Sequence, residues 1–223
     1  MSPLEKKSLF GLASLYAFRM IGLFMLLPVL SLYAEEYSGS TIILVGVALG
    51  VYGLTQGLFQ IPLGFLSDRF GRKPIIFIGM LIFFLGSIIA ATSETMLGLI
   101  AGRALQGVGA VASTIMALLS DLTTEQSRTK AMAVIGASIG VSFAVSLIVG
   151  PILANLWGLS GLFWLTAVLS ILGSLILFFL VPTPSVLRNN PESQAVPQML
   201  SRLLKNRELL RLNFGIAVLH FSQ

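Results

Sequence analysis

Between residues 64 and 74 the chain reads Gly64-Phe65-Leu66-Ser67-Asp68-Arg69-Phe70-Gly71-Arg72-Lys73-Pro74, with one acid, three bases and two glycines. About 20 mostly apolar residues precede this stretch and about 20 follow it, each run long enough to cross a hydrocarbon core roughly 30 Å thick. Short cytoplasmic loops of membrane proteins collect Lys and Arg. The stretch is therefore predicted to be a short cytoplasmic loop between two membrane helices.

The composition excludes an ordinary soluble domain. Of the 223 residues, 56% are hydrophobic and 10% are charged, and the mean hydropathy is +0.93. Soluble domains carry about 25% charged residues, so an all-α polytopic membrane protein is predicted. The net charge is +5, and 12 of the 14 Lys and Arg residues lie outside the apolar runs or at their ends. They form no basic face with aromatic platforms, which argues against nucleic-acid binding.

The sequence contains no recognisable set of catalytic residues. The chain has no cysteine and one histidine, His220, so no metal-ligand cluster and no cofactor is expected. Neither a nucleophile with its base nor a phosphate-binding glycine loop is present. We therefore do not expect an enzyme.

The apolar runs define six predicted membrane spans, which together make a domain over residues 1–181. Residues 182–208 contain four prolines and are predicted to be a cytoplasmic linker that carries a short amphipathic helix near residues 199–205. Residues 209–223 begin a seventh apolar run and stop after about half a crossing. The six spans cover approximately residues 9–32, 42–66, 74–91, 96–120, 130–156 and 161–181.

The distribution of basic residues predicts the orientation. Of the 14 Lys and Arg residues, only Arg19 and Arg103 lie inside predicted spans, and all others fall on the side of the loop at residues 64–74. The opposite loops carry Glu35, Glu36 and Glu94 and no base. By the positive-inside rule, the N-terminus is expected in the cytoplasm.

The pattern G-x-x-x-D-R-x-G-R-K between the second and third spans resembles the signature loop of the major facilitator superfamily, a family of secondary transporters. The resemblance implies a cytoplasmic gate formed by Gly64, Asp68, Arg69, Gly71, Arg72 and Lys73. A loop that only sets topology would explain the bases, but not the acid or the spaced glycines.

Asp68 is predicted at the carboxyl end of the second helix, where the helix dipole disfavours a carboxylate. Asp121, at the end of the fourth span, has the same problem. Arg72 placed between the two carboxylates would stabilise both through charge-assisted hydrogen bonds. Arg72 can reach back to Asp68 only if the helix persists through Gly71. A folded-over turn, or another chain segment as the partner of Asp68, is the equal alternative.

Two arginines lie inside apolar spans, where a charge is costly unless it meets a cavity or a partner. Arg103 and Gln106 belong to residues 99–110, which resemble the fourth-helix motif R-x-x-q-G-x-g of the family. The resemblance implies a role for Arg103 in proton coupling at a cavity, and Arg19 is expected to point into the interior. The alternative is a structural arginine that binds carbonyls of a neighbouring helix.

The fifth span contains Gly136, Gly140 and the pair Gly150-Pro151. It resembles the antiporter motif of the drug-efflux branch, although Ser146, Ala154 and Asn155 replace glycines of that motif. The alternative is a kinked packing helix. In the second span, Gln56 and Gln60 are candidate pocket groups, or else interhelical hydrogen-bonding groups. Gly46, Gly50, Gly53 and Gly57 of that span are expected to line a packing face.

Over its length the chain resembles the amino-terminal half of a twelve-helix transporter, with two inverted three-helix repeats. The resemblance implies a proton-coupled efflux antiporter of small molecules in a bacterial inner membrane. Its partners would be membrane lipid, protons, an unidentified substrate and a carboxyl-terminal six-helix half. The alternatives are a non-transporting six-helix membrane scaffold and a half-transporter that needs a partner half.

Overall fold

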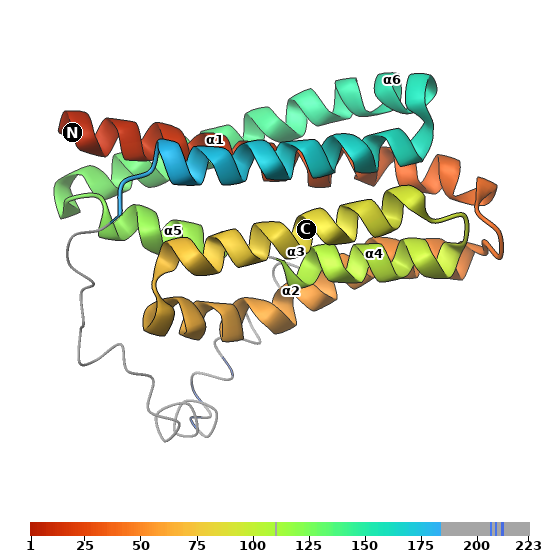
Figure 1. The fold of residues 1–223 in the computed structure, drawn as a ribbon, viewed down its shortest axis with the longest axis horizontal. Helices are drawn as coiled ribbons and strands as arrows, with labels where there is room; N and C mark the ends of the chain where they lie inside the picture. The colour runs from red at the N-terminus through yellow and green to blue at the C-terminus, as the bar shows by residue number, and fades with distance from the viewer. Residues whose placement is uncertain (110, 184–205, 207, 209–210, 212–223) are drawn as a thin grey trace. The chain divides into compact units, whose positions relative to one another are not determined.

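The computed structural model describes residues 1–109 and 111–183 and the single residues 206, 208 and 211 (Figure 1). The chain divides into two units, residues 1–187 and 188–223. The predicted amphipathic helix near 199–205 and the seventh apolar run fall almost entirely outside the described residues. The first unit is helical, with α1 (Pro3–Tyr33), η1 (Ala34–Glu36), α2 (Ile42–Phe70), α3 (Arg72–Thr92), α4 (Met96–Val108), α5 (Ala112–Asp121) and α6 (Glu125–Phe179).

The polar residues that flank the apolar runs set the helix starts. Ser2 and Glu5 form a capping box at the start of α1, followed by Pro3, whose missing N–H is not needed there. Thr41 caps α2 by accepting a hydrogen bond from Leu44 N at 3.3 Å, and Thr95 caps α4 in the same way. Helices α2 and α4 therefore begin where the sequence changes from polar to apolar, whereas α1 begins before its apolar run and includes the polar residues 5–8.

The loop predicted at residues 64–74 contains fewer non-helical residues than the sequence suggests. Helix α2 continues to Phe70, and α3 begins at Arg72. Only Gly71 leaves the helical conformation, with φ 96° and ψ 149°, values that a residue with a Cβ rarely adopts. The chain therefore reverses direction at one residue, Gly71. Residues 64–74 around this reversal are called here the signature turn.

The predicted span over residues 96–120 contains two helices, because α4 ends at Val108 and α5 begins at Ala112. Together, Met96–Asp121 are long and apolar enough to cross a membrane. Gly109 lies against α3, where an added Cβ would come within 2.7 Å of the backbone nitrogen of Phe83. Glycine weakens a helix, and the β-branched Val108 and Val111 flank the break. The helix is therefore interrupted at the point where the chain packs closely against α3.

The fifth and sixth predicted spans form one helical element, α6, that is interrupted at Gly158 (φ 65°, ψ −176°). Its two arms, 125–157 and 159–179, run in opposite directions from this residue (Figure 1). The first arm packs along α1, since Ser142 Oγ and Ser146 Oγ donate to the α1 carbonyls of Ala17 and Ile21 at 3.4 and 3.3 Å. Five helical segments of the described residues are long and apolar enough to cross a membrane when α6 is taken as one.

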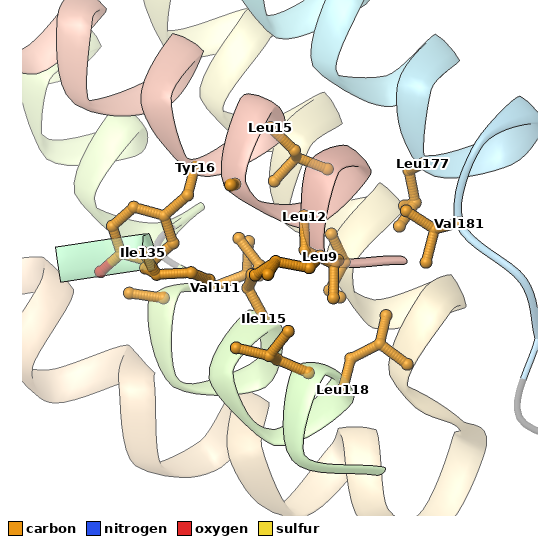
Figure 2. Packing of buried hydrophobic residues seen from close by; sticks show 14 of the residues in the cluster. Leu9, Leu12, Leu15, Tyr16, Val111, Ile115, Leu118, Ile135, Leu177 and Val181 are labelled. Carbon is orange, nitrogen blue, oxygen red and sulfur yellow. The ribbon is translucent and has the colours of Figure 1, made fainter. Parts of the chain in front are cut away.

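Two apolar clusters fill the interior of the first unit. One lies towards the signature turn, and Figure 2 shows its members Leu12, Ile115 and Leu177 from three different helices. The other lies towards the opposite end and includes Leu26 and Phe163. Along α3 and α4, the stretch between the two clusters holds polar residues of the candidate site, and Arg19 of α1 lies beside Tyr16 and Met20 of the first cluster.

Candidate functional site

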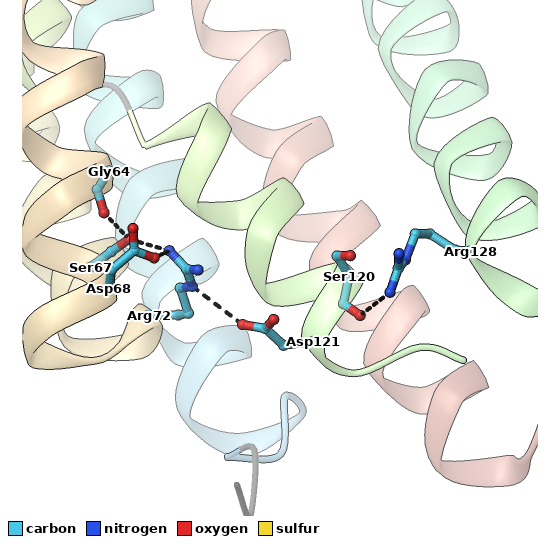
Figure 3. A network of polar contacts seen from close by, with 7 residues as sticks. All are labelled: Gly64, Ser67, Asp68, Arg72, Ser120, Asp121 and Arg128. Carbon is cyan, nitrogen blue, oxygen red and sulfur yellow. Dashed lines mark hydrogen bonds and ion pairs between the residues drawn. The ribbon is translucent and has the colours of Figure 1, made fainter. Parts of the chain in front are cut away.

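The signature turn brings Arg72 between two carboxylates, as the sequence predicts. Arg72 Nη1 lies 2.5 Å from Asp68 Oδ1, and Arg72 Nε lies 3.3 Å from Asp121 Oδ2. Because α2 stops at Gly71, the first pair forms across the reversal rather than along a continuous helix (Figure 3). Arg72 thereby joins the ends of α2 and α5 to the start of α3.

The other residues of the signature turn separate into anchored and exposed groups. Arg72 Nη1 also donates to Ser67 Oγ at 2.7 Å, and Lys73 Nζ donates to the carbonyl of Val181 at 2.7 Å, just past the end of α6. Arg69 is exposed and lies over the ring of Phe70, 5.5 Å from its centroid. Arg72 and Lys73 therefore fix the neighbouring helix ends, whereas Arg69 does not.

Arg19 of α1 and Arg103 of α4 are both buried in the bundle, and they are 2% and 1% exposed. Arg103 Nη1 donates to Gln106 Oε1 at 3.0 Å, and Arg103 Nε donates to the Ala48 carbonyl of α2 at 3.4 Å. Arg19 Nη2 donates to the hydroxyl of Tyr52 at 3.0 Å. Neither arginine forms an ion pair with a described carboxylate.

The two arginines belong to one closed set of contacts. Arg103 lies over the ring of Tyr52, 4.8 Å from its centroid, and Gln106 donates to Ser87 Oγ at 2.8 Å. Ser87 donates to the carbonyl of Phe83, and the ring of Phe83 lies 5.5 Å from the Arg19 guanidinium. This buried arginine network, comprising Arg19, Tyr52, Phe83, Ser87, Arg103 and Gln106, therefore connects α1, α2, α3 and α4.

Glycines of the fourth-helix motif allow the network to form. An added Cβ at Gly102 would lie 2.6 Å from the backbone nitrogen of Ala90, and one at Gly86 would lie 2.6 Å from that of Gln106. At Gly107 an added Cβ would collide with Thr55 and with the carbonyl of Tyr52. Because these positions have no side chain, α4 comes close enough to α2 for Arg103 to reach Ala48 and Tyr52, and close enough to α3 for Gln106 to reach Ser87.

From the sequence, Arg103 is expected to lie at a cavity, but the side chains of the buried arginine network are not exposed in the described unit. Arg19, Arg103 and Gln106 are each at most 2% exposed, so they do not line an open surface of the described unit. The bond from Arg103 to the Ala48 carbonyl is the contact that the structural alternative requires. The sequence missed Tyr52, Phe83 and Ser87, and the only signal for them was polarity or aromaticity inside an apolar run.

The remaining candidate residues, in the second and fifth predicted spans, differ in whether they contact another helix. Gln56 and Gln60 are half-buried and form no interhelical hydrogen bond among the described residues. Gly150 packs on α1, where an added Cβ would lie 2.9 Å from the Met25 carbonyl, while Gly136 and Gly140 face open space. Pro151 lies inside α6. Of these motif glycines, Gly150 therefore packs against α1, whereas Gly136 and Gly140 have no neighbour among the described residues.

The glycine face of α2 does not pack within this structure. Added Cβ atoms at Gly46, Gly50, Gly53 and Gly57 would meet no atom within 4 Å. The same holds for Gly64 of the signature pattern. The expected packing face of the second span therefore has no neighbour in the described part of the chain.

Comparisons with known proteins place the chain in a family. The family model described as Major Facilitator Superfamily matches residues 12–222. The chain is 50% identical over 220 residues to the inner membrane transport protein YajR of Escherichia coli (strain K12), covering 99% of this chain and 48% of that protein. It is 31% identical over 180 residues to the class B tetracycline resistance protein of Escherichia coli, covering 78% of this chain and 44% of that protein.

A solved structure shows the same fold. The crystal structure of the human organic anion transporter MFSD10 (TETRAN) aligns with a TM-score of 0.71 and 20% sequence identity. The alignment covers 83% of this chain and 50% of that chain. The chain thus spans about half the length of the relatives that it matches.

Proposed function

The chain belongs to the major facilitator superfamily, and on that premise we propose that it forms the amino-terminal six-span part of a secondary transporter. The transporter works by alternating access and exports small molecules in exchange for protons. The N-terminus and the signature turn lie in the cytoplasm of a bacterial cell, in agreement with the distribution of basic residues. The two arms of α6 are separate crossings, which makes six spans with α1, α2, α3 and the α4–α5 pair.

The observation that carries this proposal is the position of Arg72 between Asp68 and Asp121. The three side chains join helix ends at the face where a cytoplasmic gate must open and close. Their exposed fractions of 19%, 32% and 30% leave the ion pairs within reach of water. Such pairs are each worth about 1 kcal/mol or less, weak enough to break once in every transport cycle.

Proton coupling is supported by Arg103. A guanidinium that is 1% exposed and has no carboxylate partner among the described residues is costly inside a membrane. Intramembrane charges of this kind mark ion and proton pathways in transporters. We propose that Arg103 acts from within the bundle, through Gln106 and Tyr52, rather than as a wall of the substrate cavity.

A second six-helix body is the proposed partner. The chain spans 48% of YajR, and the glycines of α2 face open space, as do Gly136 and Gly140 of α6. Faces of small residues let membrane helices approach each other closely. The large apolar side chains that remain exposed provide contact with lipid.

Efflux is proposed from the relatives and from α6. One relative is named a tetracycline resistance protein, and Gly150-Pro151 stands within a membrane-length helix. The test uses inverted membrane vesicles that contain the full-length protein, energised to an acidic interior and followed with a pH-sensitive dye. Tetracycline and tetraphenylphosphonium are the probes. We expect at least one of them to release protons from the vesicles, and the Arg72→Ala variant to reduce that release.

The control is a set of vesicles without the protein, energised to the same pH difference. If neither probe moves protons above this control, the proposed drug–proton exchange is wrong. If a probe is transported at the same rate after the pH gradient is collapsed, transport occurs without proton coupling.

A further inference from the structure

Helix α2 is held in the bundle in an unusual way, because only three of its residues are buried: Ala48, Tyr52 and Ser67. Each of these three contacts an arginine of another helix. Ala48 and Tyr52 contact Arg103, Tyr52 also contacts Arg19, and Ser67 contacts Arg72. Contacts with arginines therefore hold the buried residues of α2 at two levels along the helix, in addition to the packing of Ala48 in the second apolar cluster.

Tyr52 is the residue that joins the two buried arginines. Its hydroxyl accepts a hydrogen bond from Arg19 Nη2 at 3.0 Å, and the face of its ring lies 4.8 Å from the Arg103 guanidinium carbon. With the side chain 4% exposed, both contacts are shielded from water, which strengthens charge-assisted hydrogen bonds and cation–π contacts. One neutral side chain thus binds two cations with different parts of its structure.

Arg19 depends on Tyr52 more than Arg103 does. Among the described residues, Tyr52 is the only hydrogen-bond partner of the Arg19 guanidinium, and Arg19 Nε and Nη1 are buried without a partner. Arg103 retains Ala48 and Gln106 when Tyr52 is removed. A buried donor that loses its acceptor bears the full cost of its desolvation, so loss of the Tyr52 hydroxyl acts mainly through Arg19.

We propose that Tyr52 is the positioning residue that fastens α2 to α1 and α4 and holds Arg19 and Arg103 at a fixed spacing. A displacement of α2 then moves both guanidiniums together. The consequence for transport rests on the proposed function. The attachment of α2 to α1 and α4 through Tyr52 is independent of the proposed function, because it follows from the contacts of Tyr52 alone.

The first test separates the hydroxyl from the ring by thermal unfolding of the purified full-length protein in detergent. Tyr52→Phe leaves the ring beneath Arg103 but removes the acceptor of Arg19, and should lower the melting temperature by about 2–4 °C. Adding Arg19→Met to Tyr52→Phe should restore the melting temperature, since the stranded donors are then gone. The matched control is Tyr37→Phe, at a tyrosine that is 9% exposed and makes no side-chain hydrogen bond among the described residues.

If Arg19→Met and Tyr52→Phe instead lower the melting temperature additively, the two residues are not coupled and the proposal is wrong. A fall for Tyr37→Phe equal to that for Tyr52→Phe would contradict it as well.

The second test measures the position of α2 directly. The chain has no cysteine, so spin labels can be placed specifically at Ile43 of α2 and Leu97 of α4, which are 75% and 70% exposed. Tyr52→Leu removes both contacts and should broaden the distance distribution between the labels, while Tyr52→Phe should leave it close to that of the parent. An unchanged distribution in Tyr52→Leu would overturn the fastening role.

This measurement needs no substrate and no gradient. A broadened distribution in a protein that shows no probe-driven proton movement would therefore reject the proposed function and retain the role of Tyr52. Probe-driven proton movement together with an unchanged distance distribution in Tyr52→Leu would support the proposed function and reject the role of Tyr52.

Discussion

The guanidinium of Arg72 bonds to the carboxylate of Asp121, 49 residues later in the chain, with 3.3 Å between Nε and Oδ2. The pair connects the first residue of α3 to the last residue of α5. Asp68, in the final turn of α2, completes the set. Two carboxylates at the carboxyl ends of helices would oppose the helix dipoles, and a single arginine compensates both.

Removal of this link should affect the transport cycle more than folding. We predict that Arg72→Ala or Asp68→Asn biases the full-length protein towards the inward-open state and lowers kcat more than it changes KM. The reason is that the lost ion pairs hold helix ends at the gate, away from the buried network. Labelling of cysteines introduced on the cytoplasmic side would report the opening.

Arg69→Ala is the matched control for the signature turn. Arg69 is exposed, lies over the Phe70 ring and forms no ion pair with a described carboxylate. It should leave labelling and turnover close to those of the parent. Equal effects of Arg69→Ala and Arg72→Ala would mean that loop charge, and not the link to Asp121, matters.

The glycines of α4 make a prediction about packing. Gly107→Ala should destabilise the protein, since its Cβ would collide with Thr55 and the Tyr52 carbonyl where no flexible side-chain end can move aside. Overpacking of this kind costs about 1–3 kcal/mol. The melting temperature in detergent is the measurement.

Gly50→Ala serves as the control for Gly107→Ala, because a Cβ at Gly50 would meet open space. Residues 1–223 carrying Gly50→Ala should unfold at the temperature of the parent or higher, as alanine favours a helix. A larger loss for Gly50→Ala than for Gly107→Ala would show that the arrangement of α2 and α4 is different.

Glu5 provides a further test, at the start of the chain. Its carboxylate accepts hydrogen bonds from Ser2 N at 2.6 Å and from Thr124 N at 2.8 Å, and so compensates the amino ends of both α1 and α6. Glu5→Ala should lower the melting temperature more than Glu125→Ala, because Glu125 is exposed in the first turn of α6. Equal shifts for the two variants would rule out a joint cap.

The sequence predicts the helical class and most helix positions because long apolar runs leave the backbone few alternatives in lipid. It also predicts the partners of Arg72, because helix dipoles and charge can be read locally. The sequence places Gly71 in a turn, but its positive φ, which shortens the loop to one residue, depends on how α2 and α3 pack. The break at Gly109 was missed for a similar reason, since it reflects contact with α3.

The buried network could not be predicted in the same way. Tyr52 lies 33 residues after Arg19 in the sequence, and nothing in its neighbourhood distinguishes it from an ordinary aromatic residue of a membrane span. The partners of a buried cation depend on which helix faces meet. Here those faces are set by Gly86, Gly102 and Gly107, whose close contacts arise only in the folded bundle.

Arg103 gives the most direct test of proton-coupled transport. The full-length protein is reconstituted into proteoliposomes with an imposed pH gradient, and uphill accumulation of the probe that responds in vesicles is measured for the parent, Arg103→Ala and Arg103→Lys. We predict that Arg103→Ala inserts but accumulates no probe. Arg103→Lys should also fail, because an ammonium cannot reproduce the separate bonds of Nε to Ala48 and Nη1 to Gln106. Gradient-driven accumulation by Arg103→Ala at the level of the parent would contradict the account.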